Sequence, residues 1–210
     1  MRAGLVVALA VALTAGTAPV HHWTEISDRT RNAAEDALYR FQRDGDPGSG
    51  RAAAAFQNAR LDDPFYYFSC DASLWQFPRD PSNDLMPYLV WRDAMFPVVV
   101  NDDAIGVLKV REMEGDPTAF FVPVPSGIYD KFKAARRRVR LGRDQQLSVL
   151  NTMVGDFFIV EDGTHIASMA PCTTRTLLLL RLPDPDVESA SYRPPDEMAP
   201  LIKDAIRERR

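Results

Sequence analysis

The feature that most constrains the fold is a hairpin pattern over residues 156–169, in which apolar runs flank the step Asp162-Gly163. Glycine adopts positive φ without steric cost, so this step suits a tight turn between two strands. Strands joined by so short a connection pair antiparallel. The pattern therefore predicts an antiparallel hairpin and excludes both a helix through 156–169 and an all-parallel sheet.

Further strands are expected elsewhere in the chain. Leu108 and Val110 alternate with Lys109 and Arg111, which is the period-two pattern of a half-buried strand. Proline cannot donate to a ladder and so confines the stretch 118–125 to a sheet edge. The remaining candidates are the aromatic stretch 62–77, the apolar runs 88–92 and 95–100, and 173–183, whose four successive leucines predict a strand buried on both faces. Five to seven strands are expected in all.

Helical periodicity appears at three places outside the strands. Residues 27–43, with Ser27 as N-cap, and residues 51–61 predict an N-terminal helical hairpin. Residues 126–143 predict an amphipathic helix capped by Ser126, and residues 200–210 a last helix with Pro200 in its first turn. The expected class is α+β: a helical hairpin, then a mostly antiparallel sheet with one amphipathic helix packed on it.

The N-terminus has the pattern of a secretory signal peptide. Arg2 precedes an apolar run over 5–13, and Gly16 and Ala18 form a small-x-small cleavage site. An uncleaved anchor is the alternative, because Pro19 would follow the cut. We expect a secreted or periplasmic protein with a signal at 1–18, a helical segment at 19–61, a sheet domain at 62–183 and a proline-rich acidic tail with a short helix at 184–210. No transmembrane helix is expected in the mature chain.

The two cysteines are interpreted in the light of export. In an oxidising compartment, Cys70 and Cys172 most simply form one disulfide. The alternative is a catalytic thiol, with His165 seven positions before Cys172 as its base. Export favours the disulfide, which would join the start of the sheet to its last strand.

Basic residues are concentrated on the predicted helix 126–143, although the chain has a net charge of −4, which argues against a nucleic-acid partner. Such a face can bind an unknown protein or an anionic surface outside the cytoplasm. The alternative is a solvated face balanced by the protein's own acidic loops. The candidate surface comprises Lys131, Lys133, Arg136, Arg137, Arg138, Arg140 and Arg143.

An aromatic cluster marks the beginning of the sheet region. Phe65, Tyr66, Tyr67 and Trp75 are the candidate recognition residues, and a core position is the alternative for each. Strand alternation would turn about half of the cluster outward.

Catalytic and metal motifs are sparse. Three histidines and two cysteines exclude most metal sites rich in these ligands, and we predict no metal, no cofactor and no catalytic residue. The sequence is interpreted as an exported, non-enzymatic binding or regulatory module. The alternative is an exported hydrolase that uses His165 with a serine, aspartate or cysteine partner.

Overall fold

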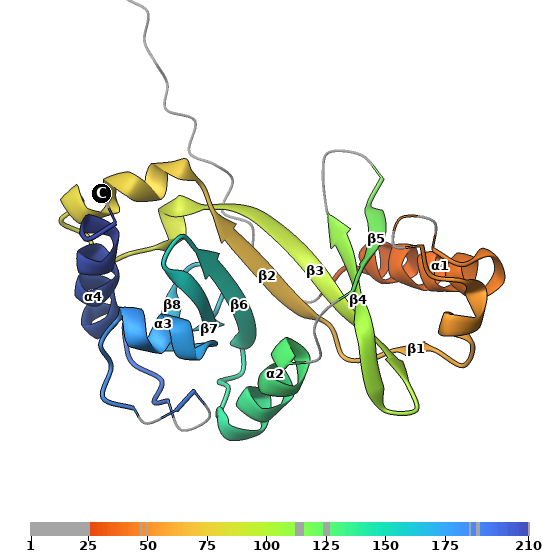
Figure 1. The fold of residues 1–210 in the computed structure, drawn as a ribbon. Helices are drawn as coiled ribbons and strands as arrows, with labels where there is room; N and C mark the ends of the chain where they lie inside the picture. The colour runs from red at the N-terminus through yellow and green to blue at the C-terminus, as the bar shows by residue number, and fades with distance from the viewer. Residues whose placement is uncertain are drawn as a thin grey trace, which may run out of the picture.

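The computed structural model describes residues 26–46, 48, 50–111, 116–123, 127–184, 186–187 and 190–209. The predicted signal peptide and the predicted helix cap Ser126 lie outside these residues. The described chain has an α+β fold, in which helices cover both faces of one sheet (Figure 1).

The described residues form an eight-stranded sheet whose main order is β5-β4-β3-β2-β6-β7-β8, with β1 paired to β3. Its pairs are antiparallel except for β2 with β6, so the prediction of a mostly antiparallel sheet is confirmed. The strands are β1 (Arg60–Leu61), β2 (Phe65–Cys70), β3 (Leu89–Val100), β4 (Asp103–Arg111), β5 (Thr118–Val122), β6 (Gln146–Thr152), β7 (Gly155–Glu161) and β8 (Ile166–Pro171).

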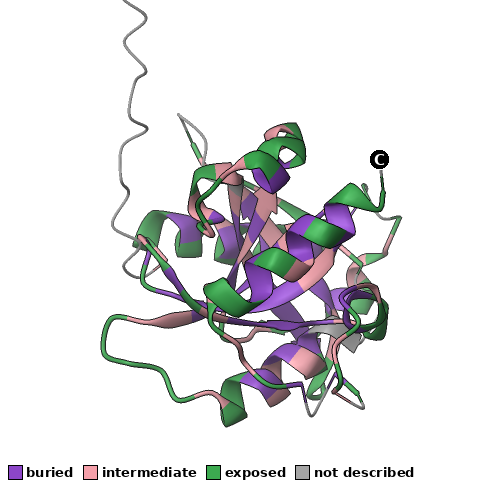
Figure 2. Cartoon of the chain, turned by 90° about the vertical axis from the view of Figure 1, so that its left-hand side faces the viewer, coloured by how far each residue is buried: buried purple, intermediate pink, exposed green. Residues whose placement is uncertain are grey.

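Helices pack on both faces of this sheet, and each is buried on the side that meets it (Figure 2). The larger core lies under α1 and α4, and the smaller core under α2, where Phe132 stacks on Phe65 of β2 with ring centroids 4.3 Å apart. The helices are α1 (Asp28–Asp44), α2 (Gly127–Arg138), α3 (Thr174–Leu179) and α4 (Pro195–Arg207), with 3-10 segments η1 (Ala53–Phe56), η2 (Ala72–Arg79) and η3 (Met86–Tyr88).

Strand alternation distributes the aromatic segment between the two cores. Tyr66 and Phe68 of β2 belong to the larger core, whereas Phe65 belongs to the smaller core and Tyr67 packs against it. The period-two expectation is therefore correct for this strand.

The predicted hairpin over 156–169 forms as β7 and β8, but its turn differs from the expected one, whereas a tight turn joins β3 to β4. Asn101 and Asp102 both have positive φ, 51° and 66°, and join β3 to β4 in a two-residue turn. The Asp162-Gly163 step instead belongs to a longer loop, since Glu161 pairs with Ile166 and only Gly163 of this step has positive φ.

The second helix of the N-terminal hairpin is not observed. Residues 51–61 contain the short 3-10 segment η1, and Asn58 then adopts a φ of 62°. The following residues pair with Val98 and Val99 as β1. Sheet pairing thus overrides the helical propensity of the alanine-rich stretch.

The predicted strand over 173–183 is wrong, because this stretch forms α3. The Thr173 hydroxyl accepts a hydrogen bond from the Thr176 N–H at 3.1 Å and so starts a helix. Leu177 and Leu180 are buried while Leu178 is 69% exposed, which is helical spacing rather than two-sided burial.

The last helix begins earlier than expected. Pro195, not Pro200, occupies its first turn, and Pro200 lies inside α4. The helix predicted over 126–143 forms as α2 but ends at Arg138, with Phe132 and Ala135 on its buried side.

The predicted Cys70–Cys172 disulfide is wrong: both cysteines are free. Ser69 is level with Asn151, Asn151 with Asp156, and the Asp156 carbonyl accepts the Cys172 N–H. The two cysteines are therefore about three strand spacings apart, roughly 14 Å, where a disulfide needs Cα atoms within about 7 Å. They also face opposite sides, since Cys70 packs on the larger core and Cys172 belongs to the smaller one.

Candidate binding cleft beside helix α2

A cleft formed by two adjoining hollows, of about 270 and 490 Å³, runs beside α2. Asp63, Phe132 and Arg136 line both hollows. The smaller hollow is completed by Asp62, Tyr129, Lys133 and Arg137, and the larger one by Ile26, Asp28, Arg31, Pro64, Phe65, Tyr66, Leu141, Gln145, Gln146 and Leu147.

The seven predicted basic residues lie on α2 and on the loop that follows it. Lys131 and Lys133 are half-buried, and the five arginines are exposed. Arg136 forms an ion pair with Asp63, whereas Arg137, Arg140 and Arg143 form none with any residue of the described chain. Most of the exposed charge on these residues is therefore not neutralised by close partners within the described chain.

The acidic counterpart of α2 comes from the β1–β2 connection. Asp63 meets Arg136 at 3.0 Å, and the Tyr129 hydroxyl donates a hydrogen bond to Asp62. This bond holds the pKa of Asp62 below its ordinary value, and Lys133 and Arg60 act in the same direction. Burial and the same contact raise the pKa of Tyr129. The cleft therefore keeps charges of both signs at neutral pH.

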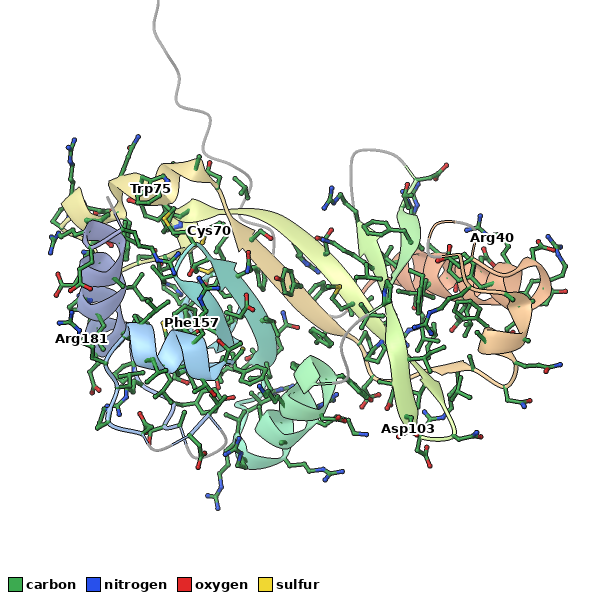
Figure 3. The ribbon with its side chains drawn as sticks, in the orientation of Figure 1. Arg40, Cys70, Trp75, Asp103, Phe157 and Arg181 are labelled. Atoms are coloured by element: carbon green, nitrogen blue, oxygen red, sulfur yellow. The ribbon has the colours of Figure 1, made fainter. Side chains whose placement is uncertain are left out.

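The predicted recognition aromatics do not form one surface. Phe65 and Tyr66 are buried and contribute to the floor of the cleft, and Tyr67 is half-buried on the same strand. Trp75 lies on η2, away from α2 (Figure 3), and lines neither hollow. The cleft is thus lined by charged side chains of both signs together with buried aromatic and aliphatic side chains.

His165 lies on an exposed turn rather than in a site. Its Nδ1 is 2.8 Å from the Thr164 hydroxyl and 3.8 Å from Asp162, which are its near neighbours in sequence. Both contacts use the same ring nitrogen, so the described residues do not place a carboxylate on one nitrogen and a hydroxyl on the other. Cys172 is fully buried, and burial raises its pKa.

Two buried carboxylates were missed by sequence reasoning. Asp93 on β3 contacts Lys109 Nζ at 2.6 Å and Arg111 Nε at 3.0 Å. An aspartate between the apolar runs 88–92 and 95–100 was the available signal, because a charge in a buried strand needs partners.

The second is Glu161, at the end of β7. It accepts hydrogen bonds from the Ser148 hydroxyl at 2.9 Å, the Gly163 N–H at 2.7 Å and the Gln146 side chain. Burial raises the pKa of Glu161, against these bonds and the nearby Arg92. Since Gln146 also lines the cleft, Glu161 fixes part of the cleft wall from behind.

The sheet order and the cleft together define an α+β protein with a mixed-charge surface cleft. No helix of the described residues is both long and apolar enough to span a bilayer. Within the same part of the chain, no group of three histidine, cysteine or acidic side chains could hold a metal ion. No family model, curated protein or solved structure matches this chain.

Proposed function

We propose that this protein is an exported, non-enzymatic binding module that holds an acidic polypeptide segment of a protein partner along α2. The observation that carries the proposal is the run of exposed arginines, Arg136, Arg137 and Arg138, at a cleft that the first two line together with aromatic and aliphatic side chains. Carboxylates of the partner would meet the guanidinium groups, and an apolar side chain of the partner would enter the cleft.

The cleft favours a polypeptide over a lipid surface. A flat anionic surface would engage the exposed arginines but could not enter the larger hollow, which Phe65, Phe132 and Leu147 help to line. An acidic peptide with an apolar side chain can use both features. Although the chain as a whole is acidic, the concentration of arginines on this face would attract an acidic peptide, and the attraction weakens once salt screens charges over about 8–10 Å.

Charge reversal on α2 tests the proposal. The probe is a short fluorescein-labelled peptide of glutamates with a central Leu-Phe pair, followed by anisotropy. Arg136→Glu, Arg137→Glu and Arg138→Glu together should weaken binding by roughly 10- to 100-fold, since each exposed ion pair contributes up to about 1 kcal/mol.

The matched control changes the net charge equally at other surfaces. Arg40, Arg79 and Arg175 are exposed and form no ion pair within the described chain, and their triple replacement by glutamate should leave binding within about threefold. Equal losses in the two triple variants would mean that net charge alone attracts the peptide. Binding of anionic vesicles but not of the peptide would also contradict the proposal.

Export rests on the pattern of residues 1–18. The intact mass of protein recovered outside the cytoplasm should lack this segment or one close to it in length. A full-length cytoplasmic product would contradict this part of the proposal.

A further inference from the structure

The two edge strands of the sheet, β8 and β5, differ in how their outward backbone groups are hydrogen-bonded. At the β8 edge, Arg193 bonds to Met169 through both backbone groups, N–H to carbonyl at 2.8 and 2.9 Å, and so covers part of the edge. At the other edge, β5 pairs with β4 alone among the described strands. The outward N–H and C=O groups of β5 therefore have no partner in the described chain, and such groups favour pairing with another strand.

The β5 edge lacks one of the usual protections against pairing, which is charge. Natural edge strands often carry charged side chains, but residues 118–122 carry none. Phe120 is 40% exposed, although it is a large aromatic residue. Beside the strand, a hollow of about 580 Å³ separates Thr118 and Ala119 from Tyr39 of α1, which leaves the edge accessible. Within the described residues, this edge is therefore apolar and unpaired.

We propose that β5 pairs antiparallel with β5 of a second copy of this chain, about a two-fold axis at Phe120. The prolines that flank this strand are placed symmetrically about Phe120. Pro117 and Pro123 lie three residues on either side of Phe120, and neither has an N–H to donate. In the two-fold register, Pro117 of each copy lies opposite Pro123 of the other copy, so the new ladder ends at the same place on both strands.

Side chains support the same register. Residues directly opposite in an antiparallel pair lie on the same face, so the two Phe120 rings would cover each other on the axis. Lys109 Nζ lies 5.8 Å from the Phe120 ring, on the neighbouring strand. Asp36 and Arg40 line the hollow on the α1 side, carry opposite charges and have no ion pair within the described chain. A flank with one charge of each sign can meet its own copy with opposite charges facing each other, which favours a second copy over an unrelated peptide.

Sedimentation equilibrium from about 1 μM to about 1 mM tests the proposal on the full chain. The parent should show reversible, concentration-dependent dimers. Phe120→Lys should weaken the dimer at least about tenfold, because it places two like charges on the axis. Val90→Lys is the control, since Val90 is 47% exposed on β3 but lies away from the β5 edge.

Cross-linking tests the register and does not depend on dimer strength. Two cysteines directly opposite in an antiparallel pair have Cα atoms about 4.5–5.5 Å apart, within disulfide range. Under mild oxidation Phe120→Cys should give a covalent dimer, whereas Val90→Cys and the parent should not. A parent that stays monomeric throughout, or dimers that form equally well with Phe120→Lys, would overturn the proposal. So would equal cross-linking of both cysteine variants. None of these results bears on peptide binding at α2, so the two proposals can fail separately.

Discussion

The contact between α4 and the loop 80–84 allows a quantitative prediction for Lys203. This lysine is 8% exposed, and its ammonium donates to the Asp80 carbonyl at 2.8 Å, the Ser82 carbonyl at 2.7 Å and the Asn83 side chain at 3.2 Å. It also lies 4.7 Å from the centroid of the Phe77 ring. One side chain thus joins the C-terminal helix to η2 and to the loop that follows it.

Lys203→Met keeps the apolar stem and removes the donors. Hydrogen bonds to a charged group contribute about 1.5–3 kcal/mol each, and the low end applies here because the loop carbonyls can regain water. Three bonds at about 1.5 kcal/mol give roughly 4.5 kcal/mol, and about 1–2 kcal/mol returns because the ammonium no longer has to be desolvated. The variant should therefore lose about 3 kcal/mol of unfolding free energy.

Urea unfolding followed by circular dichroism measures this loss, at an unchanged slope with denaturant. Arg207→Met is the matched control on the same helix. Arg207 is exposed, although it donates to the Pro78 carbonyl at 2.9 Å, so its replacement should cost less than about 1 kcal/mol. A loss below about 1 kcal/mol for Lys203→Met, or equal losses for the two variants, would refute the inferred role of the buried ammonium.

Three further predictions concern titration, charge and thiols. Because burial raises the pKa of Glu161, the folded state binds this proton more tightly than the unfolded state does. The stability of the parent therefore falls as the pH rises from the ordinary glutamate range through the folded pKa. Relative to the parent, Glu161→Gln should gain stability as the pH rises, as measured by urea midpoints. Asp63→Asn releases Arg136 and should tighten acidic-peptide binding by up to about fivefold in the anisotropy assay. Cys70, whose pKa burial raises to about 12, and Cys172 should resist alkylation in the folded protein and both react in urea without reductant, as counted by intact mass.

Each of these predictions has an outcome that contradicts it. A parent and a Glu161→Gln variant whose stability curves stay parallel with pH would show that the carboxyl is not penalised by burial. Asp204→Asn likewise releases an exposed arginine, Arg207, but on α4, which does not line the cleft, so it should not tighten peptide binding. An equal effect of the two variants would show that Asp63 has no special role. Thiols that react in urea only after reduction would show that Cys70 and Cys172 form a disulfide after all.

Local patterns predicted the elements that depend on local physics. The amphipathic stripe of α2 and the alternation of β4 were sufficient, because each element buries one side of its own periodicity. Pro123 correctly placed β5 at an edge. The strand prediction for the leucine run 177–180 was wrong because an apolar run alone fits both a strand and a helix. Here the Thr173 hydroxyl caps a helix.

The disulfide prediction was wrong for a different reason. Pairing two cysteines by elimination assumes that the fold brings them together, and nothing in the sequence reports how many strands separate them. Cys70 ends β2 and Cys172 follows β8, with β6 and β7 between. Their side chains also face opposite cores, which follows from strand register and could not be known before the sheet order.

The cleft depends on that same sheet order. β2 and β6 are parallel neighbours, so both begin at the same end of the sheet, although 75 residues lie between Cys70 at the end of β2 and Gln146 at the start of β6. The segment that enters β2 carries Asp62 and Asp63, and the segment that enters β6 follows the arginines of α2. Parallel pairing therefore places the acidic pair against the basic helix, and the Asp63–Arg136 ion pair forms between residues that are distant in sequence. The density of basic residues predicted the helix face, but the cleft could be found only once β2 and β6 were known to be neighbours.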